Sequence, residues 1–195
     1  MRIICVLVAG LMLAAAANAN LLENPGFETG LAPWVGGGVY EHGVYGAPGN
    51  ETLGDWFNAE AMGVLDRKIQ QTTTAVFMDG VTYDFWGWAI GGGNRTGIAR
   101  FQIGWDDGNG FIPLASAHYD VTGVDAWQEL DGVSYTVDGG AEIGANIIVR
   151  MADVNDLVPP EDVNLYDIWF DGAVLTPEPA SLLLLGLGAL ALRRR

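Results

Sequence analysis

Apolar and polar side chains alternate along several short stretches of this chain. In residues 81–90, Tyr83 and Phe85 fall on one face of a predicted strand. The other face carries a polar and aromatic set: Thr82, Asp84, Trp86 and Trp88. Because the period is two and not three to four residues, this stretch predicts a half-buried β-strand.

The same pattern recurs at intervals along the middle of the chain. In residues 98–105, Phe101 and Ile103 share a face with Ala99 and Trp105, while Arg100 and Gln102 point away. Further strands are predicted over residues 70–77, 127–137, 142–151 and 166–175, with glycine-rich turns between them. Many short antiparallel strands at this spacing predict an all-β fold, a single β-sandwich or jelly roll.

The amino-terminal end has the form of a secretory signal peptide. Arg2 precedes the apolar residues 3–17, and the small residues of Ala17-Asn18-Ala19 suit cleavage by signal peptidase. Residues 1–19 are therefore predicted to be removed. Cys5, the single cysteine of the chain, lies inside this segment, so the mature protein would contain neither a disulfide nor a catalytic thiolate.

The carboxyl-terminal end combines three features: the motif Pro177-Glu178-Pro179, the apolar residues 180–192, and the basic residues Arg193, Arg194 and Arg195. Thirteen helical residues would span about 20 Å, less than the roughly 30 Å hydrocarbon core of a bilayer. Terminal arginines prefer the cytoplasmic side, which would leave the rest of the chain outside the cytoplasm.

This end resembles the PEP-CTERM sorting signal of biofilm-forming Gram-negative bacteria. The resemblance implies recognition by an exosortase, which is thought to cleave near the motif. It predicts an exported protein that is held transiently in the inner membrane by residues 177–195. The protein would then reach the cell surface, the outer envelope or the extracellular matrix.

Residues 20–176 remain as one predicted domain, and it is strongly acidic. The whole chain has a net charge of −15, and this region holds 5 basic and 23 acidic residues, a net charge of −18. Nucleic acid is excluded as a partner, because phosphate binding depends on basic patches. The charge suits divalent cations or simply a soluble, solvated surface.

Four segments of this region resemble carbohydrate-binding modules with the galactose-binding-like jelly-roll fold. They are an opening strand in residues 20–30 followed by Trp34, the G-x-T-Y-x-F strand in residues 80–85, the tryptophan-containing segment 125–130, and a closing strand in residues 167–175. The first and last strands are neighbours in such modules, and the resemblance implies a structural calcium bound by Glu28 and Asp171. Alternatively, Glu28 faces solvent after a turn and Asp171 caps a strand end. Residues 106–110 have part of a calcium-loop pattern, but a hairpin turn is favoured there.

Seven tryptophans, all between the two signals, suggest a binding role. Sugars stack on indole faces while nearby polar side chains fix their hydroxyl groups. We expect Trp86, Trp88 and Asp84 to form such a site, with Arg100 and Gln102 alongside on an adjacent strand. Trp56 is expected in a loop, where it either lines the cleft or only packs against it. The alternative is that this face packs under a loop, or that a bulge at Gly87 breaks the alternation. Trp34, Trp127 and Trp169 are expected in the core.

Catalytic motifs are weak in this sequence. His42 and His118 lack metal-ligand spacing, and the glycines of residues 91–93 do not form a phosphate loop. The favoured function is a non-catalytic exported protein that binds a polysaccharide. A purely structural matrix or adhesion protein is the alternative, and a small glycoside hydrolase with two converging carboxyl groups is the third hypothesis.

Overall fold

Ten β-strands make up the regular structure that the computed structural model describes, in residues 19–27, 32–37, 39–43, 56–60, 67–90, 97–124, 126–154 and 168–178. Their bounds are β1 (Val35–Gly37), β2 (Val39–Gly43), β3 (Trp56–Glu60), β4 (Arg67–Val76), β5 (Thr82–Ile90), β6 (Ile98–Asp106), β7 (Phe111–Asp120), β8 (Gln128–Thr136), β9 (Asn146–Val154) and β10 (Trp169–Pro177).

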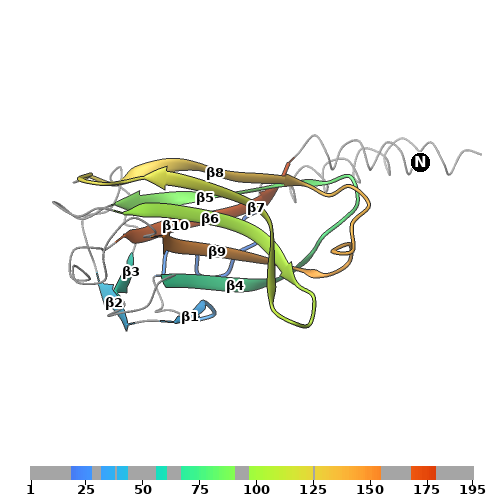
Figure 1. Cartoon of the computed structure of the whole chain (residues 1–195), viewed down its shortest axis with the longest axis horizontal. Coiled ribbons are helices and arrows are strands. Elements are labelled where there is room, and N and C mark those ends of the chain that lie inside the picture. Colours follow the sequence, from blue (N-terminus) through green and yellow to red (C-terminus); the bar gives the residue numbers. More distant parts are fainter. Residues whose placement is uncertain are drawn as a thin grey trace, which may run out of the picture.

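The strands form two five-stranded antiparallel sheets that face each other (Figure 1). The first sheet has the order β1-β4-β9-β6-β7, and the second has the order β2-β3-β10-β5-β8. From β4 onward the chain changes sheet at every connection except the β6–β7 hairpin. The predicted all-β sandwich of jelly-roll type is confirmed. No helix in the described residues is long and apolar enough to cross a bilayer; residues 1–18 and 179–195 lie outside them.

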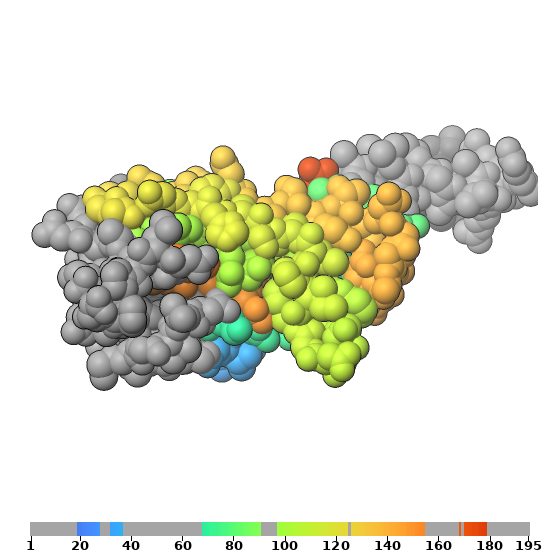
Figure 2. All heavy atoms as spheres, viewed as in Figure 1, coloured from blue at the N-terminus to red at the C-terminus, as the bar shows by residue number. Residues whose placement is uncertain are grey.

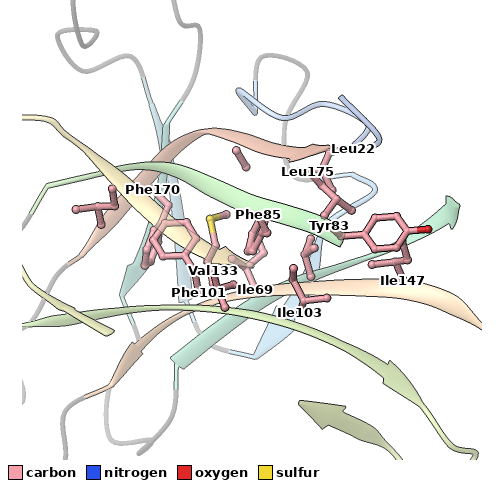
Figure 3. Packing of buried hydrophobic residues seen from close by; sticks show 14 of the residues in the cluster. Leu22, Ile69, Tyr83, Phe85, Phe101, Ile103, Val133, Ile147, Phe170 and Leu175 are labelled. Atoms are coloured by element: carbon pink, nitrogen blue, oxygen red, sulfur yellow. The ribbon is translucent and has the colours of Figure 1, made fainter. Parts of the chain in front are cut away.

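The inner faces of the two sheets meet in one apolar core (Figure 3). Phe101 of the first sheet lies at its centre, with ring centroids 5.4 Å from Phe85, 5.8 Å from Phe170 and 6.2 Å from Tyr119. Because Phe85 and Phe170 come from the second sheet, these aromatic contacts join the two layers.

The predicted strands correspond to β4, β5, β6, β8, β9 and β10, with ends shifted by a few residues. The opening strand expected in residues 20–30 is wrong for the described residues 20–27, which form bends and a turn. The largest shift is in β9, which begins at Asn146 because residues 141–144 form a turn. β7 and the short strands β1, β2 and β3 were not predicted. β7 is an edge strand of the first sheet, where Pro113 and a weakly alternating exposure pattern are tolerated.

Candidate functional site

The tryptophan strip, which we define as Trp86 and Trp88, lies on the outer face of β5 in the second sheet. Tyr83, Phe85 and Ala89 of this strand are buried in the core, so the intervening side chains point outward. Both indoles are half-buried. The predicted division of this strand into two faces is confirmed, and neither tryptophan is fully covered.

Polar groups from β8 border the strip. The Ser134 hydroxyl donates a hydrogen bond to Asp84 Oδ1, at the outward position of β5 two residues before Trp86. Glu129 is exposed and lies opposite Trp88 in the strand register. The sequence did not identify these two β8 residues, because the register between β5 and β8 cannot be read from either strand alone.

Two bulges flank the strip, and both lie in the strands next to β5. In β8, Asp131 and Gly132 together oppose Trp86; in β10, Gly172 and Ala173 together oppose Gly87. β5 itself keeps its regular alternation, so the predicted alternative of a bulge at Gly87 that breaks this face is wrong. Gly132 has a φ of 68°, and a Cβ there would collide with the Phe85 carbonyl oxygen and lie 2.5 Å from Trp86 Cα.

Arg100 and Gln102 do not join this strip, contrary to the expectation that β5 and β6 are adjacent. β6 belongs to the first sheet, and Ala99, Phe101 and Ile103 fill the core between the sheets. The side chains of Arg100 and Gln102 therefore lie on the outer face of the first sheet, on the opposite side of the sandwich.

A polar network surrounds Gln102 on that face. Its Nε2 donates to Ser116 Oγ at 3.0 Å, and only 6% of the residue is exposed. Its Oε1 is buried without a hydrogen-bond partner, which leaves one acceptor for a ligand or water. Arg150, opposite Gln102 on β9, donates to Gln70 Oε1 at 2.7 and 3.3 Å, and its guanidinium lies 3.8 Å from the Phe111 ring centroid.

Positive charge concentrates on this same face. Lys68, Arg100 and Arg150 occupy outward positions of β4, β6 and β9, and they are three of the five basic residues between the two signals. We call this surface the basic face. Asp106 and Asp120 lie at its ends, where Asp106 accepts hydrogen bonds from Gly108 and Gly110. The pKa of Asp120 is lowered by hydrogen bonds from the side chain and backbone of Thr122.

Of the two predicted calcium ligands, Asp171 lies where the described chain ends meet. Leu21 N–H donates to the Leu175 carbonyl at 2.8 Å, and Ala173 N–H donates to the Pro25 carbonyl at 3.0 Å, so the first and last segments are neighbours as expected. Asp171 is buried, 1% exposed, and its Oδ1 accepts from Gly172 N–H at 2.7 Å. A buried carboxylate fits a cation ligand. Glu28 lies outside the described residues, and those described contain no group of three or more potential metal ligands.

The other predicted residues fall in several places. Trp34 is in the core as expected, and its Nε1 donates to the Asn24 carbonyl at 3.1 Å. Trp127 is only half-buried and is outside the core cluster. Trp56 begins β3, where a loop was expected; its side chain and that of Trp169 lie outside the description. Residues 106–110 form the β6–β7 hairpin turn that the sequence favoured.

The start of the sorting motif is part of the sandwich. Pro177 is the last residue of β10 and pairs with Tyr83 in the register, and Glu178 N–H donates to the Thr82 carbonyl at 2.8 Å. Pro179 and the three terminal arginines lie outside the described residues.

Comparisons with known proteins match the two parts of the chain separately. Residues 175–195 match the PEP-CTERM protein-sorting motif. Among solved structures, the chain is similar to the module TmCBM61 in complex with β-1,4-galactotriose, at 20% identity and TM-score 0.54, over 83% of this chain and 100% of that one. It is also similar to the CBM22-1 xylan-binding domain of Paenibacillus barcinonensis Xyn10C, at 15% identity and TM-score 0.54, over 77% and 90%.

A third similar structure is an enzyme, the Stig cyclase Fisc from Fischerella sp. TAU, at 16% identity and TM-score 0.61, over 82% and 97%. No curated protein matches the chain. At these identities the similarity shows the fold and not the activity. The chain is therefore an exported protein that carries a PEP-CTERM sorting motif for exosortase processing, on a jelly roll with the fold of carbohydrate-binding modules.

Proposed function

We propose that residues 20–176 are a non-catalytic glycan-binding domain. Residues 177–195, which we call the tail, direct it to the cell surface, the outer envelope or the extracellular matrix. Signal peptidase removes residues 1–19, residues 180–192 hold the chain in the inner membrane, and an exosortase then processes the tail. The basis for the sorting steps is the motif at residues 175–195. The basis for glycan binding is the tryptophan strip.

The strip supplies the two elements that sugar recognition needs. Trp86 and Trp88 are half-exposed on one strand face, about 7 Å apart along the strand, so two adjacent rings of an oligosaccharide can contact them. Asp84, Ser134 and Glu129 beside them offer carboxylate and hydroxyl oxygens to sugar hydroxyl groups. Similar structures include modules whose ligands are galactotriose and xylan, so these two glycan classes are the first to test.

The basic face is the alternative location for the same function. It offers the unpaired Gln102 Oε1 and the guanidinium of Arg150, but Phe111 is contacted by Arg150 on its ring face and lies against Gly104, so it is a poor stacking platform. The Trp86 and Trp88 rings are therefore better placed for stacking.

Affinity electrophoresis in galactan and in xylan separates these surfaces. Trp86→Ala and Trp88→Ala should each weaken retention roughly three- to tenfold, whereas Gln102→Leu on the opposite face should leave it unchanged. If Gln102→Leu weakens retention and the two tryptophan variants do not, the glycan site lies on the basic face instead. No retention of the parent chain on any tested glycan would favour a structural matrix or adhesion protein, and release of reducing sugar would favour a hydrolase.

We also propose that calcium joins the chain ends through Asp171 and Glu28. Ca²⁺ requires six to eight oxygen ligands, so backbone carbonyls near Asn24 or Gly26 would complete the shell. Removal of calcium by a chelator should lower the unfolding temperature of the parent chain and have no effect on Asp171→Asn. An unfolding temperature that is independent of calcium in the parent chain would contradict this proposal.

A further inference from the structure

The last described residue of the chain, Glu178, lies beside the β4–β5 turn, which is hydrogen-bonded to the β8–β9 loop. Glu178 is held at Thr82, the first residue of β5. The preceding turn, residues 77–81, exchanges hydrogen bonds with the β8–β9 loop: Phe77 N–H donates to Ala145, Gly144 N–H to Phe77, and Gly80 N–H to Val137, at 2.9–3.0 Å. In Figures 1 and 2 the end of β10, in red, lies at the same end of the sandwich as these loops.

Exposed apolar side chains concentrate at this place. Five large hydrophobic residues in the described part of the chain are exposed, and three of them lie here: Met78 at 47% and Ile143 at 44% in the two loops, and Val76 at 40% at the end of β4. We call the surface formed by residues 76–80 and 138–144 the exit end. Single exposed apolar residues are ordinary on protein surfaces, but three on two hydrogen-bonded loops and the strand end that leads into one of them form a local group.

The short connection between Glu178 and the apolar run places this group of side chains close to the membrane surface. The apolar run begins at residue 180, so only residue 179 separates it from Glu178. Two residues extend at most about 7 Å, and one headgroup layer of a bilayer is about 6 Å thick. When residues 180–192 are inserted, the exit end therefore lies within the headgroup region. The shortness of the run, about 20 Å against a core of roughly 30 Å, draws the domain closer still.

We propose that the exit end is a lipid-docking surface, with the side chains of Val76, Met78 and Ile143 inserted at the headgroup boundary while the tail is in the membrane. This rests on the membrane insertion proposed above and is independent of glycan binding. Asp79 and Asp138 are also exposed at the exit end. Docking therefore favours a zwitterionic surface over an anionic one.

The test uses residues 20–195, the cysteine-free chain that the proposed signal-peptide cleavage leaves, reconstituted into phosphatidylcholine vesicles that contain shallow nitroxide lipids. An environment-sensitive fluorophore is attached through Ile143→Cys or, as the matched control, through Val35→Cys, because Val35 is the most exposed of the five residues and lies on β1. Flotation with the vesicles first shows that the tail is inserted. The lipids should quench the label at position 143 several-fold more than the label at position 35.

Serine substitutions then separate docking from mere proximity. Val76→Ser with Met78→Ser removes two side chains that each contribute roughly fivefold to the partition between water and lipid, so quenching at position 143 should fall toward the control value. Anionic lipid should lower the quenching as well.

The proposal is overturned if the two labels are quenched equally in vesicles that carry the chain. It is also overturned if quenching at position 143 survives the serine substitutions. If the label at position 143 becomes less quenched as the density of protein in the vesicle rises, the exit end contacts a second copy of the chain. That result also overturns the proposal. Failure of the chain to float with the vesicles contradicts the insertion itself.

Discussion

Gly132 lies in the β8 bulge opposite Trp86, so a side chain at this position would displace the tryptophan strip. Its φ of 68° lies in the left-handed region that favours glycine, and a Cβ would collide with the Phe85 carbonyl oxygen and lie 2.5 and 2.6 Å from Trp86 Cα and Cβ. Gly139 has the same φ of 68°, but a Cβ there would meet nothing within 4 Å. The two glycines therefore form a matched pair.

Gly139→Ala isolates the cost of the left-handed backbone, about 1–2 kcal/mol. Gly132→Ala adds a collision with backbone atoms that cannot rotate away, for which overpacking gives a further 1–3 kcal/mol. For a domain of this size each kcal/mol lowers the unfolding temperature by about 3 °C. We expect Gly139→Ala to lose about 3–6 °C and Gly132→Ala a further 3–9 °C.

Urea unfolding and thermal melts, followed by tryptophan fluorescence, measure both variants, and glycan retention measures the strip. The bulge must shift to admit the new methyl group, so Gly132→Ala should also weaken retention, while Gly139→Ala should not. Equal losses of stability in the two variants would refute the reasoning, since they would mean that the bulge opposite Trp86 tolerates a side chain.

Two further predictions follow from the core and from the β8–β9 loop. Phe101→Ala should cost about 3–5 kcal/mol in the free energy of unfolding, measured in urea, because it removes a buried ring that contacts both sheets; a loss below about 1 kcal/mol would contradict this. The pKa of Tyr135 is raised to about 12 by desolvation and by its hydrogen bond to Glu142 at 2.5 Å. The unfolded chain deprotonates near pH 10, so this contribution to stability is complete below pH 10 and is lost as the pH rises to about 12. Stability measured from pH 8 to 12 should therefore fall more steeply in the parent chain than in Tyr135→Phe, and parallel curves would argue against it.

The sequence predicted which residues of β5 and β6 face the core, because alternation is a local property of one strand. It could not predict which strands are adjacent, and Arg100 and Gln102 were placed beside Trp86 on that false assumption. Consecutive strands of a jelly roll often lie in opposite sheets, and no residue in β5 or β6 marks the change. Only the register between β6 and β9, within the first sheet, placed Arg150 beside Gln102.

β7 escaped prediction for a different reason. Two of the side chains that pack on the core, Ala115 and Ala117, are small, and the outer side chains are mixed, so the hydrophobic contrast between the two faces of β7 is low. As an edge strand it needs hydrogen bonds on one side only, which removes the usual penalty for Pro113. The proposed calcium ligands came from the resemblance alone, which placed Glu28 and Asp171 together; among the described residues, Asp171 is buried.

Pro177 and Glu178 are part of both the sandwich and the sorting motif. They end the last strand of the sandwich, opposite Tyr83 and bonded to Thr82, and they begin the motif that directs processing. An enzyme that binds the motif as an extended segment must reach it before β10 has joined the sheet, or after residues 176–178 have separated from β5. In the sorting route proposed above, maturation of the tail and completion of the fold would compete for the same residues, and the stability of the last residue pairs of β10 would set how long the chain stays attached to the membrane.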